Sequence, residues 1–550
     1  MSSKTRLEKH ITTLDSTLRD GAQGALISFS LQDKLHITEA LDEIGVDYIE
    51  AGNPFSNPKD MEFFQNAKKL KLKNARLAAF GSTRRKHIKC TDDKALLSFL
   101  EAGTQTVVFF GKSSVFQVKE VLQAGLNENL DMIAETAEFF RKNGLEIIFD
   151  AEHFFDAYKE DAQYAVKTLK AAAEGGASVL TLCDTRGASM CDEVSEITKK
   201  VCSIFSASNN VSNTVSNNAS SIAHNIQIGI HAHNDCALAV ALSLASLTAG
   251  ASHVQGTFLG FGERAGNANL SSIIANLELK MGYPVLPPRK ITALTSTAKR
   301  IAEITNIPLD AAMPFVGQDA FTHKAGMHID AVIKNPSSYE HIAPEAVGNE
   351  RTFLMSEVAG RSTIIEKIKK IAPNVTKDSK EVKLISAAVK NMEHSGYQFD
   401  NAEGSFELLV KKMLKLHQPF FKLHYYKVHG ENPTLERNAH DEMLCSFAQL
   451  KIEVAGAIEI TAGEGAGPVH ALDTALRKAL VRFYPQIETM RLIDYKVRVI
   501  DSRSATAAKV RVLIESTDGE RTWTTVGLSR DIMEASWIAL VDSVEYMLAM

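Results

Sequence analysis

The feature that most constrains the fold is a repeat in which an amphipathic stretch ends at a glycine and a short β-rich run follows. The repeat occurs five times between residues 11 and 281, and its glycines are Gly45, Gly103, Gly144, Gly176 and Gly250. Glycine after a helix readily takes the left-handed conformation that ends it. Uninterrupted apolar runs are typical of parallel strands buried on both faces. The repeat therefore predicts helices that alternate with parallel strands.

Three further apolar runs complete the expected strands. The eight predicted strands span 11–14, 46–50, 76–80, 106–110, 146–150, 179–182, 228–230 and 253–256. The predicted helices span 31–44, 60–71, 94–102, 128–143, 161–174, 192–204, 236–249 and 269–281. Eight strand–helix units in about 270 residues match a (β/α)8 barrel in number and length. A doubly wound sheet is the alternative, but it needs fewer strands and usually a glycine-rich first turn, which this chain lacks.

The chain leaves this pattern after residue 282, at a proline-rich hinge. Residues 290–425 are expected to be mostly helical, whereas runs such as 450–454 and 495–500 alternate with the period of a strand. We therefore expect three parts: a (β/α)8 TIM barrel over 1–282, a mostly helical linker over 283–428 and a C-terminal α+β domain over 429–550.

One low-complexity stretch interrupts the barrel pattern. Residues 206–224 are almost all Ser, Asn, Val and Thr. Such a composition is typical of a flexible insertion. It falls between the sixth helix and the seventh strand, on the face of a barrel away from the chemistry, so we assign it no function.

The bulk composition excludes some classes of protein. The 550 residues carry a net charge of −5, so no basic field indicates nucleic-acid binding. The six cysteines form no CxxC pair and are expected to be reduced cytosolic thiols. Residues 1–10 are polar and no apolar run of 18 residues occurs, so we expect no membrane segment and a cytoplasmic protein.

Two short motifs carry side chains that metal sites use. Arg19 and Asp20 follow the first strand, within Thr17-Leu18-Arg19-Asp20-Gly21-Ala22-Gln23. His231 and His233 follow the seventh strand, and alternation along an extended backbone puts both imidazoles on one side. Strands 1 and 7 of a barrel end at the same mouth. One carboxylate and two imidazoles there can hold a divalent metal such as Mg, Mn or Zn, with positions open for a 2-oxo acid.

Less specific interpretations of these motifs stay open at this point. Arg19 and Asp20 can form a local ion pair in a solvated loop, and the two histidines can simply be hydrogen-bonded at the start of a loop. Several other polar residues are expected on the same rim, however: Glu50, Asp150, Glu152, Asp184 and Thr185. In the glycine-rich loop after the eighth strand, Asn267 can add an oxygen ligand. Each alone is weak evidence, but together they indicate a site.

Three motifs carry a resemblance to a known family. They are Thr17-Leu18-Arg19-Asp20-Gly21, His231-Ala232-His233-Asn234-Asp235 and Gly262-Glu263-Arg264-Ala265-Gly266-Asn267. They resemble the signatures of the isopropylmalate synthase, homocitrate synthase and citramalate synthase family. The stretches most similar to the citramalate synthase branch are 56–60, 80–85, 149–156 and 494–499. The resemblance spans about residues 11–548 and fails only in the Ser/Asn-rich stretch.

This resemblance implies a Claisen-type condensation of acetyl-CoA with a 2-oxo acid, followed by thioester hydrolysis. It implies that Asp20, His231 and His233 are metal ligands, with Asn267 near the metal. Arg19 would stabilise the developing oxyanion, and the substrate would contact Arg19, Asp20, Glu152 and Thr185, of which Arg19 and Glu152 are expected to be catalytic.

The resemblance also assigns roles beyond the barrel. His328 is the expected base for the acetyl proton, with Tyr339 in support, in a segment that serves the neighbouring subunit in related enzymes. The C-terminal domain would dimerise the chain and bind isoleucine as the effector of isoleucine biosynthesis. The turn Gly463–Pro468 is interpreted equally well as purely structural or as lying near that amino acid.

Two departures from the family pattern leave the 2-oxo acid open. They are the segment 51–55 and Arg186, both expected at the barrel mouth. Pyruvate is the first expectation, and 2-oxoisovalerate, the substrate of a 2-isopropylmalate synthase, is the alternative. A metal-dependent lyase of the hydroxymethylglutaryl-CoA type is less favoured, because the loop 256–270 has no cysteine. A biotin-dependent enzyme is expected to carry a biotin-acceptor domain, and this sequence shows no such motif. The intact Arg19, Asp20, His231, His233 and Glu152 argue against a non-catalytic sensor.

Overall fold

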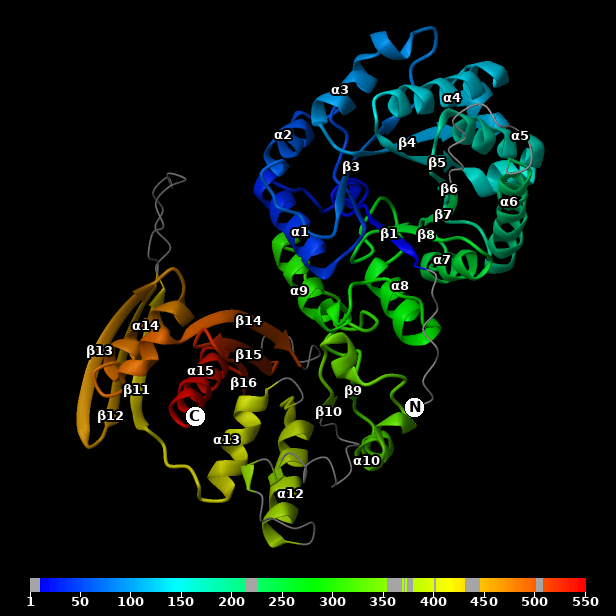
Figure 1. Ribbon diagram of the computed structural model, residues 1–550. Coiled ribbons are helices and arrows are strands. Elements are labelled where there is room, and N and C mark those ends of the chain that lie inside the picture. Colours follow the sequence, from blue (N-terminus) through cyan, green and yellow to red (C-terminus); the bar gives the residue numbers. More distant parts are fainter. Residues whose placement is uncertain are drawn as a thin grey trace. The chain divides into compact units, whose positions relative to one another are not determined.

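A computed structural model describes residues 10–212, 226–353, 368–369, 371–372, 379–399, 402–430, 446–500 and 508–550. The chain divides into two compact units (Figure 1). The first comprises Met1–Phe321 and His341–Arg351, and the second comprises Thr322–Glu340 and Thr352–Met550. The boundaries expected at 282 and 428 stay predictions.

The first unit contains a closed parallel barrel of eight strands, as the repeat predicts. Its strands are β1 (Thr12–Asp15), β2 (Tyr48–Glu50), β3 (Arg76–Ser82), β4 (Thr106–Lys112), β5 (Glu146–Glu152), β6 (Val179–Asp184), β7 (Gln227–Ala232) and β8 (His253–Gly256). The helices are α1 (Leu31–Ile44), α2 (Pro58–Ala67), α3 (Lys94–Ala102), α4 (Leu126–Lys142), α5 (Phe154–Gly175), α6 (Cys191–Ser212), α7 (Ala239–Thr248), α8 (Leu270–Asn276) and α9 (Leu294–Thr305). Short 3-10 or π turns are η1 (Gly21–Gln23), η2 (Cys90–Asp92), η3 (Gln117–Val121), η4 (Leu277–Met281), η5 (Lys290–Ala293) and η7 (Pro344–Val347).

Closure of the barrel joins its first and last strands. β1 pairs in parallel with β8, with Thr12 opposite His253 and Asp15 opposite Gly256. The five glycines of the repeat all have positive φ, between 72° and 123°. This confirms the predicted left-handed helix ends, which turn the chain from each helix into the next strand.

The interior of the barrel has an apolar cluster and a polar one. The apolar cluster is contributed by strands β1 to β6, and its buried members are Leu14, Tyr48, Ala78, Val108, Ile148 and Val179. The polar cluster consists of residues nearer the carboxyl ends of the strands, and Glu50, Asp150, Thr181, His231 and Gln255 are all buried there. The barrel is therefore a packed core that becomes polar toward its mouth.

The Ser/Asn-rich stretch differs in part from the expectation. α6 was expected to end at 204 but continues to Ser212, so residues 206–212 are helical instead of forming a loop. Helical hydrogen bonding extends into residues of low helix propensity, because each added turn needs no new nucleus. The expected flexible insertion otherwise falls on residues 213–225, which lie outside the described residues.

The second unit contains helices and two small antiparallel sheets. Its strands are β9 (Thr322–His323), β10 (Thr352–Phe353), β11 (Phe421–Gly430), β12 (Ser446–Val454), β13 (Ala457–Gly465), β14 (Arg491–Val499), β15 (Val510–Thr517) and β16 (Thr522–Ser529). Its helices are α10 (Gly326–Lys334), α12 (Lys380–Ser395), α13 (Glu403–Met413), α14 (Pro468–Leu480) and α15 (Ile532–Leu548), with short turns η6 (Pro336–Ser338) and η8 (Pro485–Thr489). The two antiparallel sheets have the orders β11-β12-β13 and β14-β15-β16, which confirms the period-two prediction. β9 and β10 form a separate pair of parallel strands.

Each sheet buries one face under a helix. α14 packs on β12 and β13, and α15 packs on β15 and β16. In β13, a Cβ at Gly463 would lie 2.5 Å from the carbonyl oxygen of Ala471, and a Cβ at Gly465 would lie 2.4 Å from the amide nitrogen of the same residue. These glycines therefore let the strand approach α14 closely, which favours the structural interpretation of the turn Gly463–Pro468.

Two expectations from composition can be compared with the described part of the chain. Among the cysteines described there, Cys90, Cys183, Cys191 and Cys236 are free thiols. Across the same residues, every helix is too short or too polar to cross a bilayer.

The packing around Gly45 generates a stability prediction. A Cβ at Gly45 would lie 2.3 Å from Pro287 Cδ, whereas a Cβ at Gly144 would have no atom within 4 Å. Both residues have positive φ, so alanine costs roughly 1 kcal/mol at either position. Gly45→Ala should cost roughly 1–3 kcal/mol more through overpacking. Calorimetric unfolding should show the larger loss for Gly45→Ala, and equal losses would contradict the packing argument.

Candidate active site

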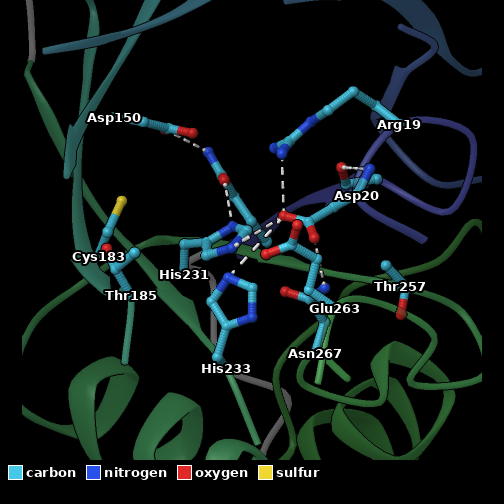
Figure 2. Close-up of polar contacts among 12 residues, drawn as sticks. Arg19, Asp20, Asp150, Cys183, Thr185, His231, His233, Thr257, Glu263 and Asn267 are labelled. Atoms are coloured by element: carbon cyan, nitrogen blue, oxygen red, sulfur yellow. Dashed lines mark hydrogen bonds and ion pairs between the residues drawn. The ribbon is translucent and has the colours of Figure 1, made fainter. Parts of the chain in front are cut away.

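Three potential metal ligands meet at the barrel mouth. Asp20, His231 and His233 are buried, and each offers one ligand atom within 4.8 Å of the others. Asp20 Oδ2 lies 3.5 Å from His231 Nε2 and 4.0 Å from His233 Nε2 (Figure 2). Asp20 lies in the turn after β1, and the two histidines lie at the end of β7 and just beyond it. The predicted meeting of strand ends 1 and 7 is confirmed.

Asp20 is held by two further contacts, which Figure 2 shows. Its Oδ2 pairs with Arg19 Nη1 at 2.9 Å, and its Oδ1 accepts a hydrogen bond from Asn267 Nδ2 at 3.0 Å. Burial by itself would raise the pKa of Asp20, but the Arg19 charge and the contact with His231 outweigh it and hold the pKa well below its usual range. Asp20 is therefore an ionised carboxylate in this site.

Arg19 is fixed between two carboxylates. In addition to Asp20, its Nε pairs with Oε2 of the fully buried Glu50 at 2.7 Å. Its guanidinium carbon lies 3.7 Å from the centroid of the Phe80 ring. Ser16 donates a hydrogen bond to the same oxygen of Glu50. Burial would lower the pKa of Arg19, but Glu50 and Asp20 raise it above its usual value, so this largely buried cation stays charged.

The unsatisfied atoms of the site test whether a metal would fit. Within the described residues, His233 Nδ1 and Asn267 Oδ1 are buried and have no hydrogen-bond partner. The pKa of His233 is lowered to about 4 by burial and by His231, so its imidazole is neutral at neutral pH. A neutral imidazole and an ionised carboxylate are the forms in which these side chains bind metals. The donor set therefore fits a divalent metal ion.

Arg264 ties together three loops around the donor set. Its guanidinium bonds Asp235 through both carboxylate oxygens, at 2.8 and 3.0 Å, and donates to the carbonyl oxygen of Thr185 at 2.9 Å. Asn234 N also donates to Gly266 O at 2.9 Å. The loops after β6, β7 and β8 are thereby joined next to His233 and Asn267.

Two predicted substrate-contacting residues lie at the ends of neighbouring barrel strands. Glu152 ends β5 and forms an ion pair with Lys112 of β4. Thr185 follows β6, and its hydroxyl oxygen accepts a hydrogen bond from the backbone N–H of His153 at 2.8 Å. Both therefore lie on the rim that bears Asp20, and their contacts with substrate stay predictions.

His328 and Tyr339 belong to the second unit. His328 lies in α10 and Tyr339 directly follows η6. Their rings stack with centroids 4.2 Å apart, and Tyr339 is 50% exposed. The pair is thus accessible, and its catalytic role stays a prediction.

The sequence interpretation missed Gln255. It treats residues 253–256 only as a strand, but Gln255 is fully buried and its Oε1 lies 2.9 Å from His231 Nδ1. Phe80, which lies against Arg19, was likewise noted only as part of a motif. The available signal was an amide at an inward-facing position of a buried strand, where a polar group needs a partner.

Three family models match successive parts of the chain. The HMGL-like model matches residues 10–301, which is more than half of the chain. The model described as "Homocitrate synthase post-HMGL domain-like" matches residues 315–396. The model described as "LeuA allosteric (dimerisation) domain" matches residues 401–548.

Several curated proteins are similar over nearly their whole length. The (R)-citramalate synthase of Aquifex aeolicus is 48% identical over 97% of both chains. That of Synechocystis sp. is 46% identical over 97% of this chain and 95% of the relative. That of Geobacter sulfurreducens is 44% identical over 97% of both chains.

The loop contacts of Arg264 generate a prediction about metal binding. Arg264→Gln removes the tie between the loops that carry His233 and Asn267, so we expect the dissociation constant for Mn²⁺ to rise on the order of tenfold, as for other outer contacts of metal sites. Stability should change little, because the side chain is 44% exposed. Titration calorimetry with the metal alone measures the constant.

Arg186→Gln is the matched control. Arg186 also bonds one carboxylate twice, that of Asp156, at 2.9 and 2.7 Å. Arg186 lies in the loop after β6, but it joins this loop to Asp156 of α5 and not to the loops that carry His233 and Asn267. The Mn²⁺ constant should therefore stay unchanged. Equal effects of the two substitutions would refute the loop-tying role.

Proposed function

We propose that this chain, which belongs to the HMGL-like family and, within it, to the (R)-citramalate synthases, condenses acetyl-CoA with pyruvate to give citramalate and CoA. The reaction is an acyl transfer in which the acyl group becomes an alkyl group. The observation that carries the proposal is that Asp20, His231, His233 and Arg19 converge at one mouth of the barrel. The curated (R)-citramalate synthases that are similar to this chain over nearly its whole length support it. A metal ion and a fixed cation can together polarise a carbonyl group and stabilise the oxyanion that forms when a carbon nucleophile adds to it.

The chemistry assigns each barrel residue a role. A divalent metal held by Asp20, His231 and His233 would polarise the keto carbonyl of pyruvate. Arg19 stabilises the negative charge that develops on the keto oxygen when the new carbon–carbon bond forms, and its two carboxylate partners keep it in place. Asn267 Oδ1 is a further oxygen beside this set.

The acetyl group has to lose a proton before it can attack. We assign the removal of this proton to His328, which stacks on Tyr339. The resulting carbanion equivalent adds to the keto carbon, the keto oxygen takes up a proton, and water then hydrolyses the thioester to release CoA. Thr185 can donate a hydrogen bond from its hydroxyl group to the pyruvate carboxylate, and Glu152 lies on the same rim beside Lys112.

A basic cavity supports acetyl-CoA as the second substrate. It has a volume of about 230 Å³ and lies at the ends of β3 and β4. Its lining includes the four basic side chains Arg84, Arg85, Lys86 and Lys112. Arg84 is already paired with Glu135 and Lys112 with Glu152, so the guanidinium of Arg85 and the ammonium of Lys86 are the groups suited to the phosphates of CoA.

The loop after β2 bears on the choice of 2-oxo acid. Asp60 forms a buried ion pair with Lys34, whose Nζ lies 2.6 Å from its carboxylate, and it accepts a hydrogen bond from Asn53 N at 2.9 Å. These contacts hold in place the segment 51–55, which departs from the family pattern. Arg85 lies over the ring of Phe55 in the same loop. Because this loop departs from the family pattern, the alternative is 2-isopropylmalate synthase activity, with 2-oxoisovalerate as the 2-oxo acid. The choice between the two acids is made by experiment.

The substrate prediction is tested by the release of CoA. Purified protein with Mn²⁺ and acetyl-CoA should release free thiol fastest with pyruvate, compared with 2-oxobutyrate, 2-oxoisovalerate and 2-oxoglutarate. His231→Ala should abolish release while the protein stays folded, because one imidazole of the donor set is lost. Circular dichroism checks the fold of this variant.

The possible outcomes separate the alternatives. Preference for 2-oxoisovalerate would replace the proposal with the isopropylmalate reaction. No release with any acid would overturn the condensation itself. Full activity of His231→Ala would remove the metal assignment.

We also propose that the chain forms a homodimer regulated by isoleucine, as a step of isoleucine biosynthesis. The match to the LeuA allosteric (dimerisation) domain over 401–548 supports this proposal. Apolar side chains are exposed on the sheets of the second unit, and they include Ile458, Ile460, Ile493 and Val499. Such side chains are typical of a surface that another protein covers.

Isoleucine should lower the rate of CoA release in a saturable manner. The physical reason is linkage, because an effector that binds one conformation better shifts the chain toward it. Leucine, an isomer of the same size and charge, is the matched control and should act only at higher concentration. A rate that stays constant across a wide isoleucine titration would exclude this regulation.

A further inference from the structure

A chain of buried hydrogen bonds runs from Asp150 through Gln255 to His231. Gln255 Nε2 donates to Asp150 Oδ1 at 2.8 Å, and Gln255 Oε1 lies 2.9 Å from His231 Nδ1. Figure 2 shows Asp150 and His231 at the two ends of these contacts. Gln255 is fully buried, Asp150 is 4% exposed and His231 is 5% exposed. None of the roles given so far explains Asp150 or Gln255.

The direction of these hydrogen bonds follows from the carboxylate. An ionised carboxylate accepts hydrogen bonds and cannot donate one, so Gln255 must turn its NH₂ group toward Asp150. The amide oxygen of Gln255 then faces His231, and an oxygen can only accept. His231 therefore carries its proton on Nδ1.

The charge of Asp150 is consistent with this order. Burial raises its pKa to about 6, against the opposing effects of His231 and of the hydrogen bond from Gln255. Asp150 is therefore mainly ionised at neutral and alkaline pH. Thr181 Oγ1 accepts a second hydrogen bond from Gln255 Nε2 at 3.0 Å, but a hydroxyl can accept or donate and does not fix a direction.

We propose that Asp150 and Gln255 are positioning residues that keep the unprotonated Nε2 of His231 directed at the metal position. A neutral imidazole has one nitrogen that can bind a metal, and protonation of Nδ1 leaves that nitrogen as Nε2, which lies 3.5 Å from Asp20 Oδ2. Asp150 thereby orients His231 indirectly, through the side chain of Gln255. The inference deepens the proposed function, since it concerns the same donor set.

The alternative is that Asp150 and Gln255 only fill the barrel interior. A purely structural role would change stability when either residue is altered, but it would not change which nitrogen of His231 bears the proton. The two roles are therefore separated by measuring the proton position and the metal affinity together with stability.

Asp150→Asn is the substitution that tests the direction. Asparagine keeps the size of the side chain, but its amide can present either an oxygen or an NH₂ group, so Gln255 is free to turn over. A turned Gln255 would offer NH₂ to His231 and place the imidazole proton on Nε2. We expect the Mn²⁺ dissociation constant to rise on the order of tenfold, measured by calorimetry with the metal alone.

Nitrogen-15 spectra of histidine-labelled, metal-free protein at alkaline pH give a second measurement. The native protein should show His231 protonated on Nδ1, and the variant should show a signal for the Nε2-protonated form. The spectrum of His231→Asn identifies the resonance. This measurement does not depend on catalysis, so it can succeed even where no CoA is released.

Thr181→Val is the matched control. It removes the hydroxyl that also bonds Gln255, but it leaves the carboxylate that sets the direction. Both the Mn²⁺ constant and the His231 signal should stay as in the native protein. An Asp150→Asn variant with native metal affinity and only Nδ1-protonated His231 would overturn the proposal.

Discussion

The pairing of Arg19 with Asp20 and Glu50 is the interaction on which the site depends. It places one cation between two buried carboxylates at the barrel mouth. An unpaired charge there would be strongly unfavourable, and removal of either partner leaves the other without compensation. The same pairing keeps Asp20 ionised beside two imidazoles. The positive charge of Arg19 therefore has two roles. It compensates the buried carboxylates of Asp20 and Glu50, and it can stabilise the oxyanion that forms during carbonyl addition.

The barrel supports this arrangement by separating polar from apolar interior positions. The apolar cluster around Leu14 and Val108 fills part of the interior, whereas Gln255 donates hydrogen bonds to both Asp150 and Thr181 nearer the mouth. Each polar group in that layer is useful only if its partner is in place, because an unsatisfied buried group is costly. Outside the barrel, Arg264 bonds the loops next to His233 and Asn267 to one another.

Much of the barrel could be predicted from local sequence. The glycines after the helices and the apolar runs indicated all eight strands, because helix ends and buried parallel strands are recognised within a few residues. The end of α6 was wrong, since Ser and Asn lower helix propensity without forbidding a helix. The meeting of Asp20 with the two histidines was predictable, because the barrel topology brings strands 1 and 7 to one mouth.

The sequence by itself therefore determined the order of strands and helices and the residue types at the ends of the strands. Only the tertiary structure decided which of those residues bond one another. Gln255 and Asp150 lie 105 residues apart in the chain, and nothing local to either residue indicates a shared hydrogen bond. Side-chain pairing inside a closed barrel depends on register and packing across several strands, and these are set only when the whole barrel forms.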